Sequence, residues 1–236
     1  MASAVKADIV TQWNFNSSTP DANVATGTLT PSVGVGTASL LGVTGSFSSG
    51  TGSVDPAGTN DNSAWQTVTY AAQGTGNLSR GVQFAASTVG YQNVQVSWDH
   101  RNSNTGSRFW ALLYTTDGST WNTFSATGAG TDSGLYDISS GGTWFNQRTA
   151  DLSGISGVND NANFGIRIVA SFAPGLTTYA ASNTGSNYGT TGTARFDMVT
   201  ISGTFTAIPE PSSVLLTAAV ACGYLSRRPW RRKLAA

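Results

Sequence analysis

The sequence predicts an all-β protein: a two-sheet antiparallel β-sandwich of the jelly-roll type, followed by a short hydrophobic helix near the C-terminus. Composition is the first reason, since charged residues make up 10% of the chain and glycine supplies 28 of its 236 residues, whereas about 25% charged is typical of globular proteins. Spacing is the second, because glycines and Ser/Thr/Asn clusters interrupt stretches with helical periodicity. The third is the alternation of apolar and polar residues in short runs, which indicates half-buried strands.

The expected strands are short and are separated by turn residues. Residues 94–98 alternate strictly between apolar and polar, which predicts a strand with one buried face. The dipeptide Asp117-Gly118 between two strand-like runs predicts a hairpin. About nine or ten strands joined in this way favour a sandwich. In chain order, the main ones are expected at 9–15, 38–41, 81–85, 94–98, 109–115, 121–124, 144–150, 164–170 and 195–204.

The charges of the body argue against nucleic acid as a partner. Residues 8–207 contain six arginines and eleven aspartates, which leaves a net charge near −5. Proteins that bind nucleic acid neutralise phosphates with a basic surface, and no such surface is predicted here. The single cysteine, Cys222, lies outside this segment, so the body can form no internal disulfide and offers no thiolate to a metal.

The composition changes at residue 208, and three distinct parts follow. Pro209-Glu210-Pro211 comes first, and its prolines end the last strand because they cannot donate a ladder hydrogen bond. An apolar run at 214–225 follows, with Val214, Leu215, Leu216, Val220 and Leu225 among its residues. The basic residues of the third part are Arg227, Arg228, Arg231, Arg232 and Lys233. Since basic residues stay on the cytoplasmic side of a membrane, this order predicts a transient membrane anchor with a cleavable hinge.

Taken together, these parts resemble the sorting tail of the PEP-CTERM family of exported bacterial proteins. The resemblance covers about thirty of the 236 residues. In that family an exosortase, which is a membrane protease, removes the tail, and members are exported by bacteria that make an exopolysaccharide or biofilm matrix. The resemblance implies export to the cell surface or extracellular matrix, an exosortase-type protease as partner, and Pro209, Glu210 and Pro211 as the sorting residues.

Three segments are therefore expected. Residues 1–7 contain a Val-Lys-Ala stretch without an apolar region before it, which indicates a truncated or residual signal segment, the alternative being a cytoplasmic N-terminus. Residues 8–207 form the sandwich, and 208–236 the tail. The apolar run is short, since twelve residues extend about 18 Å as a helix against a hydrocarbon core of about 30 Å. A segment that is removed need not anchor tightly, and a run that is apolar on all sides disfavours a soluble amphipathic helix.

Two stretches of the body are similar to the jelly-roll modules of carbohydrate-binding and adhesin-type extracellular proteins. Residues 110–121 show their strand-turn-strand pattern ending in a tryptophan, and residues 195–201 show their final strand. The resemblance covers about thirty residues of the chain. It implies a fold, and a fold alone does not imply a ligand.

Asp197 is the carboxylate of most interest, because a charge within an apolar strand is costly unless it is paired or bound to a metal. In the resembling modules the corresponding aspartate often helps to hold a structural calcium. Oxygen ligands suited to such a hard cation are offered by Asn14, Asn16 and the loop 60–62. The alternatives are that Asp197 pairs with an arginine such as Arg167 or Arg195, or that it faces solvent.

Aromatic residues in or beside the expected loops indicate polysaccharide as a ligand, because flat rings can stack on sugars. Aromatic rings also fill sandwich cores, and the tryptophans within expected strands belong there. The Gly/Ser/Asn/Thr-rich stretch 172–193 is expected to carry contacts, since long loops are often functional. The candidate ligand-binding residues are Trp65, Trp121, Trp144, Tyr179 and Tyr188.

No catalytic constellation is visible in the sequence. His100 is the single histidine, and neither a nucleophile elbow nor a zinc-protease motif accompanies it. Its expected role is structural, near the end of a strand. The body contains no glutamate, so a glycosidase would have to use a pair of aspartates. A non-enzymatic polysaccharide-binding protein is therefore predicted, with two alternatives: a purely structural matrix protein, and a glycan-active hydrolase that uses Asp pairs.

Overall fold

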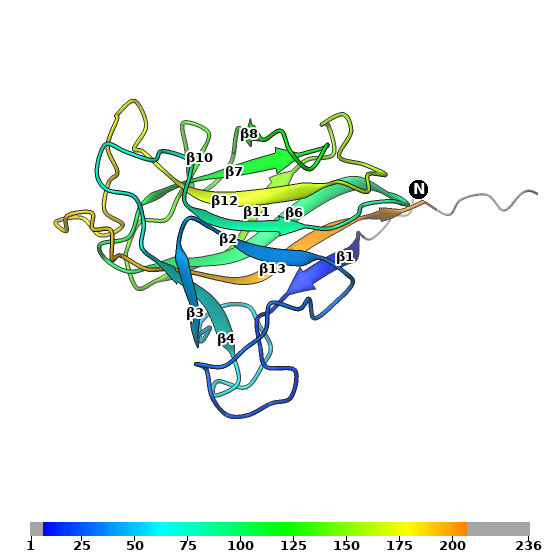
Figure 1. Ribbon diagram of the computed structural model, residues 1–236, viewed down its shortest axis with the longest axis horizontal. Helices are drawn as coiled ribbons and strands as arrows, with labels where there is room; N and C mark the ends of the chain where they lie inside the picture. Colours follow the sequence, from blue (N-terminus) through cyan, green and yellow to red (C-terminus); the bar gives the residue numbers. More distant parts are fainter. Residues whose placement is uncertain (1–6, 207–236) are drawn as a thin grey trace, which may run out of the picture. The chain divides into compact units, whose positions relative to one another are not determined.

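The computed structural model describes residues 7–206, which form two antiparallel sheets packed face to face (Figure 1). The strands of sheet A are β1 (Asp8–Trp13), β3 (Thr44–Ser49), β4 (Ser63–Val68), β6 (Tyr91–Asn102), β11 (Trp144–Asp151) and β13 (Ala194–Phe205). Those of sheet B are β2 (Thr37–Leu41), β5 (Gly81–Ala85), β7 (Phe109–Thr115), β8 (Asn122–Phe124), β9 (Thr131–Asp132), β10 (Leu135–Asp137) and β12 (Gly165–Ser171). The predicted sandwich is confirmed.

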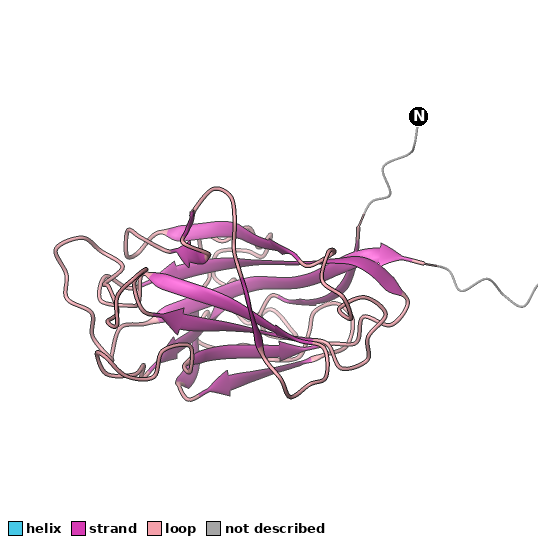
Figure 2. Ribbon diagram, turned by 90° about the horizontal axis from the view of Figure 1, so that it is seen from above, coloured by secondary structure: helices cyan, strands magenta, loops and turns pink. Residues whose placement is uncertain are grey.

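The two layers are joined by strands that alternate between them. Sheet A has the order β11-β6-β13-β4-β3 with β1 beside β13, and sheet B has the order β2-β5-β12-β7-β10-β9 with β8 beside β7. From β4 to β7 each successive strand changes sheet, as do β11, β12 and β13. This crossing is the connectivity expected of a jelly roll. Figure 2 shows the layers from above, with loops at both ends.

Several predicted elements match the structure closely. Strands β5 and β7 have the predicted bounds, and the predicted strand at 94–98 extends to the full length of β6. The hairpin at Asp117-Gly118 is confirmed, since β7 and β8 pair in antiparallel fashion and Gly118 has a φ of 77°. The sequence pattern does not predict β3, β4 or the short β9 and β10; three of the six residues of β3 are serines, and Trp65 of β4 was expected in or beside a loop.

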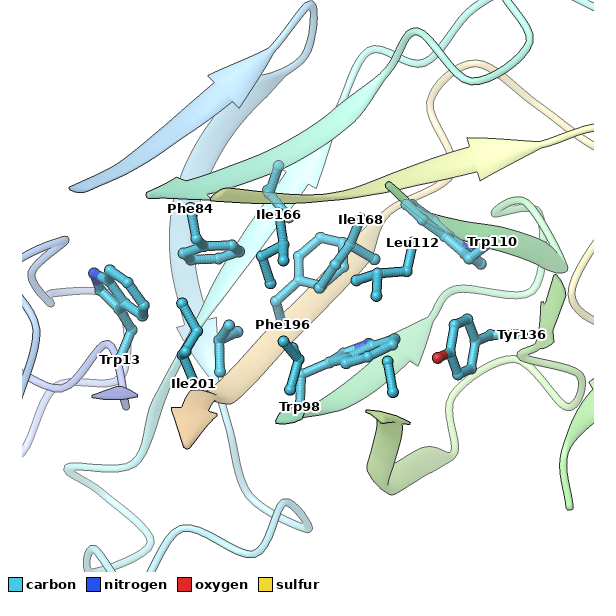
Figure 3. Close-up of a cluster of buried hydrophobic side chains, with 14 of the residues drawn as sticks. Trp13, Phe84, Trp98, Trp110, Leu112, Tyr136, Ile166, Ile168, Phe196 and Ile201 are labelled. Carbon is cyan, nitrogen blue, oxygen red and sulfur yellow. The ribbon is translucent and has the colours of Figure 1, made fainter. Parts of the chain in front are cut away.

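The core lies between the sheets and is largely aromatic (Figure 3). Trp98 and Phe196 of sheet A face Trp110 of sheet B, and the rings of Trp110 and Phe196 are 5.6 Å apart at 80°. Edge-to-face contacts of this kind contribute about 0.5–1.5 kcal/mol beyond the buried area. The inward positions of β12, which include Ile166 and Ile168, are fully buried. The outward positions between them are therefore free for other contacts.

Both ends of the described chain lie at the same end of the sandwich, since Asp8 pairs with Gly203 (Figure 1). The sorting motif, the apolar run with its expected helix, and the basic residues lie outside the described residues. Within residues 7–206 there is no helix long and apolar enough to cross a membrane.

Candidate functional site

Asp197 lies on the outer side of sheet A, beneath the loop that joins β3 to β4. Its neighbour Phe196 is in the core, so alternation along β13 directs Asp197 outward. Asp99 of β6 is its cross-strand partner and also points outward. The loop covers both carboxyl groups, which are 0% and 1% exposed. We define the Asp197 cluster as Asp55, Asp99, Asp197, Asn16, Ser53 and Asn62.

Backbone N–H groups hold the two carboxyl groups in place. Asp197 Oδ1 accepts the N–H of Met198 at 2.8 Å, and Asp99 accepts those of Val54 at 2.6 Å and Gln147 at 2.7 Å. Met198 and Gln147 lie at irregularities of β13 and β11 and have positive φ values of 48° and 53°. Backbone strain of this kind persists where surrounding structure enforces it, and here it directs N–H donors at buried carboxyl groups.

Burial makes the charged form of Asp197 costly. Desolvation raises its pKa well above the usual range, a hydrogen bond from Ser53 opposes the shift, and the negative charges of Asp55 and Asp99 add to it. The pKa of Asp99 is raised for the same first reason, and its two N–H donors oppose that shift. Asp55 receives a hydrogen bond from Asn16 Nδ2 at 2.8 Å. A proton or a cation at Asp197 would relieve this repulsion.

Several oxygen atoms gather beside Asp197 and against Gly50. Asn62 is 3% exposed, and within the described chain its Oδ1 accepts no hydrogen bond. A Cβ on Gly50 would lie 1.8 Å from Asn62 Oδ1 and 2.7 Å from Asp197 Oδ2. Ser53 Oγ lies 2.7 Å from the same carboxyl oxygen. Ca²⁺ takes oxygen ligands of this kind, at about 2.3–2.6 Å, and Gly50 lets Asn62 Oδ1 and Asp197 Oδ2 approach the backbone closely.

Carboxylates alone would not hold that ion. Among residues 7–206, no three Asp, Glu, His or Cys side chains converge on a point where a metal could bind. Amide, hydroxyl and backbone oxygens would have to complete the set around Asp197. Asn16 belongs to the cluster through its bond to Asp55. Asn14 reaches the cluster only through Asn16, whose N–H it accepts at 3.4 Å, and the two asparagines line a polar pocket of about 340 Å³ with Thr28 and Thr30.

The two alternatives for Asp197 are wrong. It does not face solvent, and it forms no ion pair with an arginine: in the part of the chain that the structure describes, the ion pair is Arg108–Asp137 at 2.6 Å. Arg167 and Arg195 each donate Nε to a glutamine instead.

The outer side of sheet B carries a second candidate site. Ile166 and Ile168 point into the core, so Arg167 between them points outward. Arg167 pairs with Gln83 of β5 on one side and with Leu113 of β7 on the other. The outward row through Arg167, together with the tryptophan that lies over it, is called the Trp121 face: Ser39, Gln83, Arg167, Leu113, Thr123 and Trp121.

Arg167 and Trp121 hold each other in position. The guanidinium carbon lies 3.8 Å from the centroid of the Trp121 ring, and Arg167 Nε donates to Gln83 Oε1 at 2.8 Å. The indole also approaches Gly165, where a Cβ would lie 3.3 Å from it, so the ring lies close against the sheet. Trp121 and Arg167 are both half-buried. Partial burial lowers the pKa of the guanidinium, which still remains charged at neutral pH.

A cavity adjoins this face. The next outward row along the strands contains Thr37, Ala85 and Gly165, the last of which lies against Trp121. Thr37 and Ala85 also line a mainly apolar cavity of about 380 Å³, together with Gly118 and Asn163. A ligand longer than one sugar could therefore contact the Trp121 face and this cavity at once.

The other candidate aromatic residues lie apart from this face. Trp65 belongs to β4, is 2% exposed and packs on Phe15 in the core, so its expected loop position is wrong. Trp144 is half-buried on β11 of the other sheet, against Gly52. The candidate aromatics thus do not form one surface.

Tyr179 and Tyr188 fasten the long loop at 172–193. Their rings stack at 4.6 Å and 20°, and Tyr179 is only 4% exposed. The hydroxyl of Tyr188 donates to the carbonyl of Ala71 at 2.7 Å, and that of Tyr179 to the carbonyl of Gly76 at 2.9 Å. Both rings serve the packing of this loop against residues 71–76.

His100 is buried among aromatic rings. Its ring lies 4.5 Å from that of Trp110 and 4.7 Å from that of Phe196, and Nε2 lies 3.1 Å from Asn102 Oδ1. Nδ1 has no hydrogen-bond partner among the described residues. Burial lowers the pKa of His100 to about 3, a shift that the bond to Asn102 opposes. The imidazole is therefore neutral and structural at physiological pH.

No protein-family model and no curated protein matches the chain. Among solved structures, it is similar to the CBM22-1–GH10 modules of the endo-1,4-beta-D-xylanase 10B of Clostridium thermocellum, complexed with xylohexaose (14% identity, 75% of this chain and 28% of that chain, TM-score 0.40). It is also similar to the K2 cleaved adhesin domain of Lys-gingipain (11% identity, 81% and 96%, TM-score 0.38). The K1 cleaved adhesin domain of Lys-gingipain from Porphyromonas gingivalis W83 is a third (15% identity, 70% and 89%, TM-score 0.34). The chain thus spans about a quarter of the xylanase structure.

Proposed function

We propose that this chain is an exported, non-enzymatic protein of the cell surface or extracellular matrix that binds polysaccharide on the Trp121 face. The observation that carries the proposal is the pair of Trp121 and Arg167 on the outer side of sheet B, 3.8 Å apart and half-buried. An aromatic ring beside a row of hydrogen-bonding side chains offers both contacts that a sugar needs, an apolar surface and polar partners. The adjoining cavity lengthens this surface.

The carboxyl groups support a binding role over hydrolysis. Asp99 and Asp197 form a pair in register across β6 and β13, yet both are buried beneath the loop and accept N–H donors. Glycosidases need two carboxyl groups that flank a bound glycosidic bond. This pair cannot reach a polysaccharide at the surface, and the proposed role for Asp197 is instead to hold a structural calcium ion with Asn62 and Ser53.

Replacement of Trp121 by alanine is expected to weaken binding of the full chain to its polysaccharide by about 10- to 30-fold, since removal of a central aromatic contact costs about 2 kcal/mol. Affinity electrophoresis against a panel of bacterial and plant polysaccharides, followed by calorimetry on the ligands found, measures the effect. Intrinsic tryptophan fluorescence should shift on binding in the wild type and shift less in the variant.

Trp144→Ala is the matched control, because Trp144 is also half-buried but lies on the other sheet. Its affinity should equal that of the wild type. Loss of binding in Trp144→Ala and not in Trp121→Ala would place the site on sheet A. If the wild-type protein is folded but binds no polysaccharide in the panel, the remaining function is that of a purely structural matrix protein.

We further propose that an exosortase-type protease processes the chain at Pro209-Glu210-Pro211. The support is the order of motif, apolar run and basic residues in the sequence. In a host that carries an exosortase, the mature protein is expected to lack the apolar and basic parts, as intact mass will show. A variant with alanine at both Pro209 and Glu210 should keep its full mass and stay in the membrane fraction. A variant with alanine at Pro229 should instead be processed like the wild type. An identical mass with and without the protease would contradict the proposal.

A further inference from the structure

We propose that the Trp121 face selects acidic polysaccharides, with a carboxylate of the sugar paired to the guanidinium of Arg167. This inference rests on the proposed polysaccharide binding and specifies its ligand. It follows from the hydrogen bonds that Arg167 makes, from the absence of charge around it, and from its geometry beside Trp121.

Most of the donors of Arg167 remain available. A guanidinium has five N–H donors, and Arg167 uses its Nε–H on Gln83 Oε1. Within residues 7–206 its two terminal amino groups have no hydrogen-bond partner and it forms no ion pair. Its pKa is shifted by burial alone, so no carboxylate lies close enough to stabilise the charge. A half-buried cation in this state has already lost part of its hydration and lacks a counter-ion.

The other arginines of the sandwich have different partners; Arg101 likewise donates only its Nε, but among the described residues no aromatic ring lies over it. Arg108 is neutralised by Asp137 through two bonds of 2.8 and 2.6 Å. Three further arginines donate to backbone carbonyl groups, and Arg195 donates both to a glutamine and to a carbonyl. These three are Arg80, Arg101 and Arg148. Arg167 is therefore distinguished by an open guanidinium edge on a face that also offers an aromatic ring.

The surroundings of Arg167 lack competing acids. Its row across sheet B contains Ser39, Gln83, Leu113 and Thr123, none of which is charged. This is notable because aspartates outnumber arginines by eleven to six in residues 8–207. None of these eleven aspartates lies in the row through Arg167. A carboxylate supplied by a ligand would find no repulsion within the row, and charges farther than about 8 Å away are largely screened at physiological salt.

The geometry suits a planar anion. Arg–carboxylate pairs are commonly bidentate, with two parallel N–H···O bonds in the guanidinium plane. Gln83 and the Trp121 ring fix that plane from two sides, which reduces the entropy lost on binding. A uronic acid carries its carboxylate on the sugar ring itself. One such residue could place its carboxylate on the terminal amino groups of Arg167 and its ring next to the stacked guanidinium and indole.

The test compares polymers with and without free carboxylate groups. Polygalacturonate and its fully methyl-esterified form make one pair, and xylan with and without glucuronate substituents makes a second. The affinity of the full chain for each is measured by calorimetry at low and at physiological salt. At least one acidic polymer is expected to bind at least about tenfold more tightly than its neutral counterpart, and salt should reduce this preference.

Arg167→Gln should abolish the preference, so that the acidic polymer and its neutral counterpart bind with equal affinity. Arg167→Lys should restore part of the preference, because it keeps the charge and loses the planar fork. Arg101→Gln removes one positive charge from a site on sheet A and should behave as the wild type. Thermal melting confirms that each variant is folded.

Equal binding of acidic and neutral polymers, or a preference that survives Arg167→Gln, would overturn this inference. If the neutral polymers bind in a manner that depends on Trp121, polysaccharide binding at this face stands and only the acidic selectivity is lost. If no polymer binds, the proposed function fails as well.

Discussion

Millimolar Ca²⁺ is expected to raise the melting temperature of the calcium-free protein by about 5–10 °C. A ligand that binds only the native state at a hundredfold excess over its Kd stabilises it by about 2.7 kcal/mol. In a domain of this size each kcal/mol shifts the midpoint by about 2–4 °C. The gain arises because the ion would neutralise Asp197, whose charge is buried beside those of Asp55 and Asp99, and would bind the unpartnered Oδ1 of Asn62. Thermal melts in chelator and in CaCl₂ measure it.

Gly50→Ala separates this effect from general salt effects. Its Cβ would lie 1.8 Å from Asn62 Oδ1 and 2.7 Å from Asp197 Oδ2, so it would displace two of the oxygen atoms that are proposed to bind the ion. Gly58→Ala is the matched control, because it lies in the same loop and its Cβ would meet nothing within 4 Å. The calcium shift should disappear in Gly50→Ala and persist in Gly58→Ala. Equal shifts in both variants, or none in the wild type, would exclude calcium from this site.

The pH dependence of the calcium-free protein tests the same cluster. Burial raises the pKa of Asp197 in the native state, whereas an aspartate of the unfolded chain has a pKa of about 3.9. Between these two pKa values the native protein binds a proton that the unfolded chain does not. The contribution of this group to stability is thus present at low pH and is lost as pH rises through the native pKa. Calcium requires the deprotonated form, so the calcium shift should shrink as pH falls.

The local sequence pattern predicts the main strands, but it does not predict β3 and β4. Residues 44–49 are polar and rich in Ser and Gly, and they form a strand because they pair with β4 in an unbroken register from Thr44 to Ser49. Trp65 has a core position for the same reason, since its strand is held against β13. Pairing with distant strands overrides weak local preference, and a single sequence does not show those pairings.

The candidate sites divide in a similar way. Asp197 could be identified from sequence, because a carboxylate in an apolar strand always needs an explanation, and its burial is confirmed. Gly50 could not, since its importance lies in the approach of two side chains, Asn62 just before β4 and Asp197 of β13. Arg167 was expected only as a partner for Asp197. Its contact with Trp121 joins residues that are 46 positions apart and depends on the folding of β8 back onto β7.

The free energy of unfolding is expected to fall below pH 6.5 because of His100. Its pKa is about 3 in the native state and about 6.5 when exposed, so over this range the unfolded chain binds a proton that the native core excludes. This stability is fully present above pH 6.5 and is lost as pH falls toward 3. The loss is about 1.4 kcal/mol per pH unit, or about 2 kcal/mol at pH 5. Urea denaturation at pH 7 and pH 5 measures it.

His100→Phe isolates this contribution from the opposing one of Asp197. A phenyl ring can keep the contacts with Trp110 and Phe196, and Nδ1 already lacks a partner in the described structure, so the principal loss is the bond to Asn102. With calcium fixed, the carboxyl groups titrate alike in both proteins and cancel in the difference. The variant should therefore gain about 2 kcal/mol on the wild type between pH 7 and pH 5. Parallel stability curves would instead mean that the histidine is protonated in the native core, which its aromatic surroundings and missing acceptor oppose.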